Sequence, residues 1–334
     1  MQKPTLYTST QTQSIGQIAD YHARKNVFMD VQLGKSYNTR RRYRNDLELF
    51  SQYLEEAGLD LPVDNLLEDP GSWEPITYGL VKGFMHWQLK KGYAVSSCNV
   101  RLFTVRKFCG LAFEAGAIDN ETLALIERVK GFNPKETRNI DRERKATRRG
   151  KKKATPIFLS DDQVIQLKGQ AAEQGQRNLL LICLLVDHGL RCGEAGRSGE
   201  VEQMKVSSIN ISAGTITFYR EKVDKTQTHR LSNDTLEAAR IYLPTIPTNG
   251  PLFYGYQRKA LCSNTINHIV KQLGLKIGIT NLSPHDLRHT WATRAARSGT
   301  TLQTLMEAGG WKTVKVALSY IEANKIANDG VVLG

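Results

Sequence analysis

The sequence predicts a mainly helical protein with a small β-sheet, divided into an all-helical domain and a mixed α/β domain. Three observations predict this class. Apolar residues recur at spacings of three and four along most of the chain, whereas one short segment alternates with the period of a strand. A basic stretch without apolar residues lies between two apolar-rich regions. The 334 residues are enough for two domains with separate cores.

The first domain is predicted over residues 15–133, after a polar, Thr- and Gln-rich segment, residues 1–14, that we expect to be a flexible tail. From about Ser36, apolar residues such as Tyr43 and Leu47 follow helical spacing, and Gly58 ends the run. The same reasoning predicts further helices over residues 75–92, 96–116 and 120–131.

Residues 134–156 form the basic stretch, with ten Lys and Arg against three acidic residues. The stretch cannot build a core, because it has almost no apolar side chains. One interpretation is a solvated linker. The other, which we favour because both flanking regions are also basic, is a tether that crosses a phosphate backbone between two DNA-gripping domains.

The second domain is predicted over residues 157–334. Ser160 is expected to cap its first helix, and the apolar segment 178–189 is a buried helix. Glu200 is expected to begin a short helix, and the alternating segment 214–220 is a strand that leads into a Lys-rich turn. Further helices are predicted over residues 231–242, 263–276, 284–298, 301–308 and 314–328.

Charge is the first indication of function. The formal net charge is +13 and the isoelectric point is about 9.5, which favours a polyanionic partner such as nucleic acid. No apolar run approaches the roughly 20 residues of a membrane span. The beginning of the sequence lacks an apolar signal core, and the five cysteines form no CxxC pair. We therefore expect a cytoplasmic, nucleoid-associated protein with no membrane partner.

The segment NLSPHDLRHTWATR, residues 281–294, combines a helix start with two histidines and two arginines. Ser283 and Pro284 suit the N-cap and first helical positions, so His285 and Arg288 share one face near the positive helix end. A zinc helix would need HExxH, but Asp286 replaces the glutamate and no third ligand motif follows. We therefore expect no metal, and we expect His289 to pack on the helix.

Other candidates suit a phosphate. Arg191 follows the buried helix in HGLRCGE, and Lys225 follows the predicted strand in VDKTQTHR. Trp311 precedes Tyr320 by nine residues in GGWKTVKVALSY. Guanidinium, ammonium and indole groups donate hydrogen bonds to phosphate oxygens, and a tyrosine hydroxyl can act as a nucleophile. Metal-free phosphoryl transfer needs such positioning and charge neutralisation.

These motifs, in this order, resemble those of the tyrosine recombinases, also called the phage integrase family. The resemblance covers residues 155–328 through motifs and, more weakly, residues 35–130, which look like the family's helical core-binding (SAM-like) domain. It implies a core-binding domain joined to a catalytic domain of tyrosine-recombinase type. The catalytic residues that it implies are Arg191, Lys225, His285, Arg288, Trp311 and Tyr320.

The arginine motif departs from the family pattern, because RCGE at Arg191 is followed by RSGE at Arg197. Removing six residues restores the usual spacing in either of two ways. Arg191 directly follows the end of the upstream helix, which favours it as the first catalytic arginine. Arg197 instead has the expected spacing to the predicted helix that begins at Glu200, which favours Arg197. We prefer Arg191. Among the lysines, we prefer Lys225 over Lys222, since Lys225 stands five residues before Arg230.

The resemblance implies a site-specific DNA recombinase of phages or other mobile elements, acting in DNA integration or excision through a 3′-phosphotyrosine intermediate without metal, ATP or other cofactor. Its partner would be double-stranded DNA, bound by a homotetramer in the synaptic complex and by a monomer or weak oligomer otherwise. Two alternatives stay open: a DNA-binding protein with impaired strand transfer, and a type IB topoisomerase-like enzyme. The predicted DNA-binding residues are Arg40, Arg41, Arg42, Arg44, Arg101, Arg106, Lys107, Arg148, Arg149, Lys151, Lys152 and Lys153.

Overall fold

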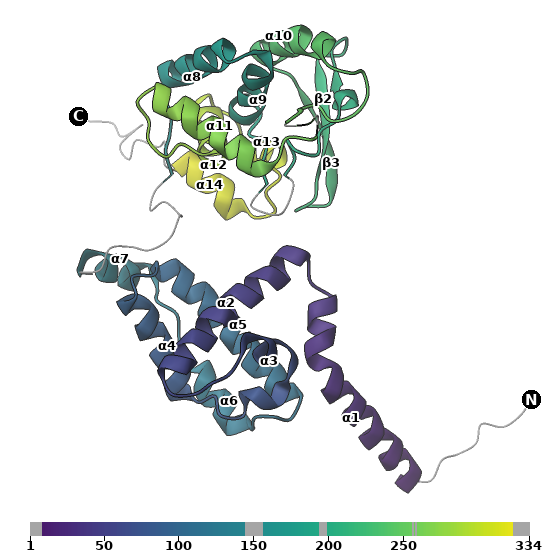
Figure 1. The fold of residues 1–334 in the computed structure, drawn as a ribbon, viewed down its shortest axis with the longest axis vertical. Helices are drawn as coiled ribbons and strands as arrows, with labels where there is room; N and C mark the ends of the chain where they lie inside the picture. The colour runs from purple at the N-terminus through teal and green to yellow at the C-terminus, as the bar shows by residue number, and fades with distance from the viewer. Residues whose placement is uncertain (1–8, 144–155, 194–198, 256, 258, 323–334) are drawn as a thin grey trace, which may run out of the picture. The chain divides into compact units, whose positions relative to one another are not determined.

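The structure is a computed structural model that describes residues 9–143, 156–193, 199–255, 257 and 259–322. The chain separates into two units, Met1–Lys152 and Lys153–Gly334, which we describe one at a time (Figure 1). Helices make up most of both units, in agreement with the predicted fold class. None of the helices described here is long and apolar enough to cross a membrane.

The first unit, which we call the helical unit, is built from helices alone over its described part (Figure 1). Its elements are α1 (Ser9–Leu33), α2 (Tyr37–Glu56), α3 (Val63–Glu68), η1 (Pro70–Trp73), α4 (Tyr78–Lys90), α5 (Val95–Glu114), α6 (Asn120–Glu127) and α7 (Pro134–Glu143). Ser36 caps α2 by accepting a hydrogen bond from the Thr39 amide at 3.4 Å, which confirms the predicted helix start.

An aromatic core holds the helical unit together. Phe50 stacks with Trp73 and meets Phe84 edge to face, and Trp73 in turn stacks on Phe108. All four side chains are fully buried. Burying side chains of this size contributes about 1.5–3 kcal/mol each. The helical spacing seen in the sequence therefore reflects one shared core.

Two predicted irregular segments are partly helical. We predict a flexible tail through residue 14, but α1 begins at Ser9. We predict a linker from residue 134, but residues Pro134–Glu143 form α7, which packs against α5. Helices are recognised in a sequence by the regular spacing of apolar residues. The first six residues of α1 and nearly all of α7 are polar, so neither segment shows that spacing. The predicted DNA-binding residues Arg148, Arg149, Lys151, Lys152 and Lys153 lie outside the described residues.

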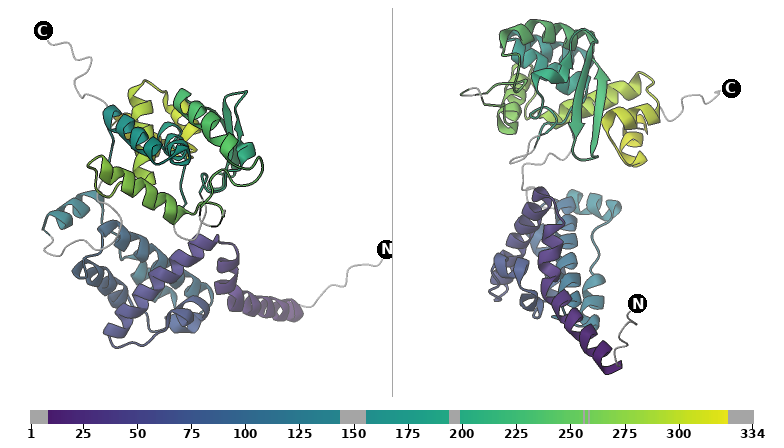
Figure 2. Two further views of the ribbon diagram at one scale, coloured as in Figure 1. Left: turned by 45° about the horizontal axis from the view of Figure 1, so that its top comes forward. Right: turned by 90° about the vertical axis from the view of Figure 1, so that its right-hand side faces the viewer.

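In the second unit, which we call the catalytic unit, a small sheet lies at the edge of a group of helices (Figures 1 and 2). Its helices are α8 (Asp161–Glu173), α9 (Gln176–Asp187), α10 (Asn233–Tyr242), α11 (Ser263–Lys276), α12 (Pro284–Arg297), α13 (Leu302–Gly309), α14 (Val314–Glu322), η2 (Val206–Ser208) and η3 (Leu243–Thr245). The described strands β1 (Ile209–Asn210), β2 (Thr215–Arg220) and β3 (Lys225–Arg230) form an antiparallel sheet in the order β1-β2-β3.

Helix α9 is the centre of the catalytic unit, with α8, α10 and α12 packed against it. Its apolar residues are buried on all sides, as the sequence predicts. Ser160 caps α8 in a reciprocal capping box with Gln163, which confirms another predicted start. The helix expected to begin at Glu200 is absent, because residues 200–203 form turns and Glu200 is buried in the site described below.

Candidate active site

The loop that leaves α9 carries Arg191, and Gly189 allows its path. Gly189 has a φ of +60°, and a Cβ atom there would lie 2.2 Å from Cε3 of Trp291. Only glycine fits both conditions without strain. The carbonyl of Gly189 accepts a hydrogen bond from the buried guanidinium of Arg288. The glycine therefore brings the α9 loop against α12.

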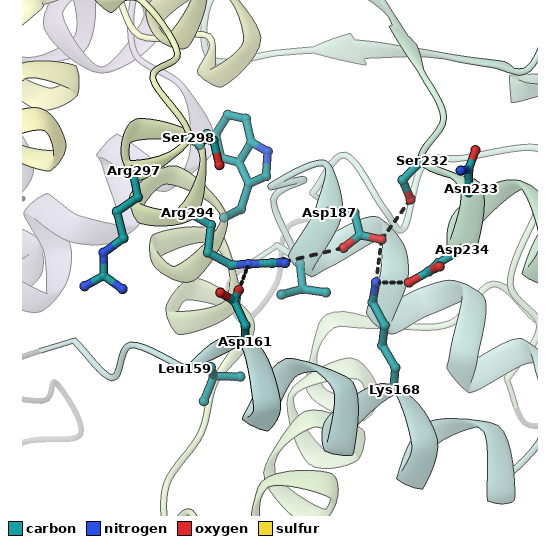
Figure 3. Close-up of a pocket in the computed structure, with 13 residues that line it drawn as sticks. Leu159, Asp161, Lys168, Asp187, Ser232, Asn233, Asp234, Arg294, Arg297 and Ser298 are labelled. Atoms are coloured by element: carbon teal, nitrogen blue, oxygen red, sulfur yellow. Dashed lines mark hydrogen bonds and ion pairs between the residues drawn. The ribbon is translucent and has the colours of Figure 1, made fainter.

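A network of charged side chains fixes the end of α9 (Figure 3). Asp187 accepts hydrogen bonds from Lys168 Nζ and Ser232 Oγ, both at 2.8 Å. Lys168 also binds Asp234 at 2.6 Å, and Arg294 binds Asp161 at 2.7 Å (Figure 3). Helices α8, α9, α10 and α12 are thus linked one residue before His188, where the chain turns toward Arg191.

An ion pair joins residues from the two copies of the arginine motif. Arg191 comes from the first copy, and its Nη1 forms a 2.8 Å ion pair with Glu200 of the second copy. The other oxygen of Glu200 accepts the Arg191 backbone amide at 3.0 Å. The intervening residues are thus an insertion between an arginine and its carboxylate partner. Arg197 lies outside the described residues.

Three arginines converge on the last carbonyl groups of α13. Gly309 O accepts from Arg191 Nη2 at 3.2 Å, from Arg220 Nη1 at 2.9 Å and from Arg288 Nη2. The C-terminal end of a helix carries partial negative charge, so it stabilises guanidinium groups. Gly310 caps this helix in the left-handed conformation, with a φ of +59°. Each guanidinium has five donors, which leaves donors for another acceptor.

Most of this cluster is buried: Arg220, Arg288 and Glu200 lie out of solvent, whereas the side chain of Arg191 is 23% exposed. The side chain of Arg220 is 0% exposed and that of Glu200 5%, and Glu200 Oε1 lies 3.3 Å from Arg220 Nη1. Burial lowers the pKa of Arg288 to about 9, and the charges of Arg191 and Arg220 add to this effect. Burial likewise lowers the pKa of Arg220 to about 10. The site is therefore rich in positive charge held out of water, an arrangement suited to an anion.

Helix α12 begins where the sequence predicts. Ser283 donates to Asp286 Oδ2 through its backbone amide at 2.8 Å and its hydroxyl at 2.6 Å. Asp286 Oδ1 accepts the amide of Ile157 at 3.0 Å, so both carboxylate oxygens are used by the fold. His285 is exposed, and its ring centroid lies 4.4 Å from that of His289, edge to face.

Tyr320, on α14, contacts both α12 and the segment that precedes α14. Its ring stacks on Trp311 with a centroid separation of 5.4 Å, and Arg288 lies 5.0 Å from the centroid of the Trp311 ring. Its hydroxyl lies 2.6 Å from Nδ1 of His289. Burial raises the pKa of Tyr320, although the positive charge of Arg288 opposes the shift. The phenol therefore keeps its proton at neutral pH.

Lys225 opens β3, directly opposite Arg220 in the sheet register. Its exposed side chain lines a cavity of about 570 Å³ together with Trp311 and Gly310. Trp311, which stacks on Tyr320, thus lines the same cavity as the lysine. Of the predicted catalytic residues, Arg191, Arg288, Trp311 and Tyr320 gather closely, His285 joins them through His289, and Lys225 borders them across this cavity.

Sequence reasoning misses three residues of this cluster. Arg220 looks like the end of an ordinary strand, and Glu200 looks like the start of a helix. His289, which we expect to pack on α12, instead contacts the tyrosine hydroxyl. For Glu200 the sequence does hold a signal. Glu200 ends RSGE, the second of the two arginine motifs, and removing six residues places it at the usual spacing from Arg191.

The predicted DNA-binding residues of the helical unit divide into two groups. Arg40, Arg41, Arg42 and Arg44 are exposed on α2, although Arg44 pairs with Asp64 at 2.7 Å. Arg101, Arg106 and Lys107 on α5 are instead half-buried. Arg101 donates to Gln88 at 3.2 Å and lies over the ring of Tyr93. Long basic side chains on α5 partly cover the core, which a charge pattern does not show.

Comparison with known proteins decides the family. Residues 158–326, about half of the chain, match the "Phage integrase family", and residues 28–116 match the "Phage integrase, N-terminal SAM-like domain". The chain belongs to the phage integrase family. This protein is a site-specific tyrosine recombinase, an enzyme that cuts and rejoins DNA. The family assignment made from the motifs is thereby confirmed.

Individual relatives cover most of the recombinase. Tyrosine recombinase XerD of Staphylococcus epidermidis is 25% identical over 309 residues, which cover 89% of this chain and 92% of that protein. The Tn1549 transposon integrase in complex with transposon right end DNA has a TM-score of 0.66 at 14% identity, covering 92% and 96% of the two chains. A lambda integrase tetramer bound to a Holliday junction has a TM-score of 0.63 at 16% identity, covering 92% and 79%. These structures share the fold.

Proposed function

We propose that Tyr320 attacks a backbone phosphate of DNA, which leaves a 3′-phosphotyrosine and a free 5′-hydroxyl. One observation carries this proposal: the ring of Tyr320 stacks on Trp311, beside a cluster of three arginines of which Arg220 and Arg288 are buried. The cluster supplies positive charge where a phosphate would react. The energy of the broken bond is kept in the phosphotyrosine, so rejoining needs no ATP.

Each predicted residue has a role in this reaction. Arg191 and Arg288 hold the non-bridging oxygens, because both keep guanidinium donors beyond those that bind Gly309. Trp311 offers its indole N–H to the same phosphate. Lys225 protonates the leaving 5′-oxygen from across the cavity. His285, exposed at the beginning of α12, orients the phosphate near the positive helix end.

We further propose that four copies assemble on two DNA duplexes and act in integration or excision of a mobile element in the cytoplasm. The lambda integrase tetramer on a Holliday junction supports this assembly. The exposed arginines of α2, together with the basic segment that contains Arg148, Arg149 and Lys151–Lys153, would follow the phosphate backbone. Without DNA the protein would be a monomer or a weak oligomer.

Covalent trapping in cells tests the proposal. Wild type, Tyr320→Phe and the control Tyr219→Phe, which changes an exposed tyrosine on β2, are expressed and denatured, and protein that carries DNA is isolated. We expect DNA on wild type and on the control, linked through Tyr320 and clustered at one sequence. Sequence-specific binding in all three without any covalent DNA would instead support a binding protein that lacks strand transfer.

A further inference from the structure

We propose that His289 is a catalytic residue that accepts the proton of Tyr320 as the tyrosine attacks DNA and returns it during rejoining. The proposal rests on the function proposed above. The hydroxyl oxygen of Tyr320 lies 2.6 Å from Nδ1 of His289, a hydrogen bond that joins α14 to α12. A base must lie within about 2.6–3.2 Å of the proton that it removes. His289 meets this condition at the reacting atom itself.

The helix places His289 for this task. It follows Arg288 directly, so one turn of α12 presents a phosphate ligand and an imidazole to the same site. Phe158 packs edge to face against the imidazole with a centroid separation of 6.1 Å. His289 is half-buried, and Tyr320 is 9% exposed. Little water therefore competes for the phenol proton.

The charge states favour transfer in this direction. Burial lowers the pKa of His289 to about 4, with His285 and Arg288 adding to the shift and Asp286 opposing it. The imidazole is therefore neutral at neutral pH, and an unprotonated Nδ1 can accept the phenol hydrogen. Burial raises the pKa of Tyr320, so the nucleophile needs a base to become reactive.

A full transfer before attack would be unfavourable, since the phenol is the weaker acid. As the bond between the Tyr320 oxygen and phosphorus forms, however, the phenolic proton becomes strongly acidic. The proton then moves to Nδ1, the bond from phosphorus to O5′ breaks, and Lys225 protonates O5′. The imidazolium that results lies beside DNA phosphate, whose negative charge stabilises it. Rejoining reverses each step.

His285 and His289 have different roles in this mechanism. The two rings meet edge to face with a centroid separation of 4.4 Å, but it is Nδ1 of His289 that lies within hydrogen-bond distance of the reacting oxygen and accepts its proton. His285 is the exposed member of the pair, which suits contact with DNA. A variant of His285 should therefore weaken the hold on the phosphate, whereas a variant of His289 should slow the attack.

The first test needs no DNA. In protein labelled with ¹⁵N-histidine, NMR at pH 7 should show His289 neutral, with its proton on Nε2 and Nδ1 bare. Tyr320→Phe should shift the Nδ1 resonance, and the surface variant His268→Ala on α11 should leave it unchanged. A proton found on Nδ1 would overturn the proposal, because that atom would then be a donor. This result does not depend on whether the chain cuts DNA.

The second test uses the DNA site recovered by trapping. DNA with sulfur in place of the bridging O5′ needs no acid, because a thiolate leaves without protonation. We expect His289→Ala to form the phosphotyrosine about 10²–10⁴-fold more slowly on normal DNA and on this sulfur-containing DNA. Lys225→Ala should be slow on normal DNA and restored on the sulfur-containing DNA. If the sulfur-containing DNA also restored the cleavage rate of His289→Ala, His289 would assist the leaving group, which would contradict its role as the base for Tyr320.

A pH profile separates a base from a residue that only holds the tyrosine. His289→Gln can still accept the hydrogen bond but cannot take the proton. The wild-type rate should fall as the pH is lowered through the pKa of His289 in the complex, and this dependence should vanish in His289→Gln. An unchanged profile, or faster cleavage by His289→Ala, would overturn the proposal. Absence of cleavage in wild type would count against the proposed function instead.

Discussion

The arginines on α2 of the helical unit and those in the active site of this recombinase's catalytic unit differ in burial. In the helical unit, Arg40 and Arg41 lie exposed on α2, over a core of aromatic rings. In the catalytic unit, Arg220 is 0% and Arg288 4% exposed, and the acid beside them, Glu200, is also buried. An arginine that only attracts a DNA backbone can remain in solvent, where its charge carries no desolvation penalty.

An arginine that holds one reacting phosphate must be oriented before the phosphate arrives. Burial against the carbonyls of α13 supplies that orientation, and the low-dielectric surroundings strengthen the interaction with the anion. The cost is desolvation of charge, which several hydrogen bonds and Glu200 offset in part. The comparison predicts that substitutions in the buried cluster have large effects and those on α2 small ones.

The largest effect is expected for Arg288→Gln. Removing a guanidinium that neutralises the reacting phosphate should slow phosphotyrosine formation by about 10³-fold or more. Quantitative cleavage of the trapped DNA site in a single turnover measures this. Arg297→Gln, an exposed position near the end of the same helix, is the matched control and should stay within a few-fold of wild type. Similar losses in both variants would show that the effect is one of helix stability.

A large loss of stability is expected for Arg220→Met. The substitution takes donors from the half-buried Ala308 O and the buried Gly309 O and a cation from the buried Glu200, so we expect a loss of about 2–4 kcal/mol. Urea denaturation of the full chain measures the change. The exposed Arg240→Met on α10 should cost under about 0.5 kcal/mol. Equal values for the two variants would refute the contrast between buried and exposed arginines.

Acid should destabilise the catalytic unit. Burial lowers the pKa of His188 to about 4 from the ordinary value of 6.5. Between these pH values the unfolded chain binds a proton that the folded chain does not, so stability falls as the pH is lowered from about 6.5 toward 4. For a histidine as buried as His188 the loss is roughly 1–3 kcal/mol. Thermal unfolding between pH 7 and pH 5 measures it, and His188→Asn should weaken the dependence.

The smallest effect on stability is expected for the double variant Arg40→Gln/Arg41→Gln, which should change the free energy of unfolding by less than about 0.5 kcal/mol. DNA affinity should fall modestly, and the slope of log affinity against log salt should decrease by about two, since each phosphate contact contributes about 0.9. Binding titrations at several salt concentrations measure this. Lys90→Gln on α4 serves as the control. An unaltered slope would remove α2 from the proposed DNA surface.

Local patterns predicted much of this protein. Ser36, Ser160 and Ser283 each begin a helix at the expected place, because a cap depends on residues within one turn. The resemblance to the tyrosine recombinases placed Trp311 and Tyr320 in one site, and the two rings do stack. Helix α1 was missed, because its first six residues are polar and its later apolar residues form no clear helical stripe.

The sequence by itself therefore determined the family, the helix starts and the candidates for the chemistry. Tertiary structure alone decided the rest: that Arg191 pairs with Glu200 across the insertion, that Arg220 joins the arginine cluster, and that His289 meets the tyrosine hydroxyl. The physical reason is separation along the chain. A motif records which side chains share a turn, but contacts between α9, β2, α12 and α14 arise only when their common core has packed.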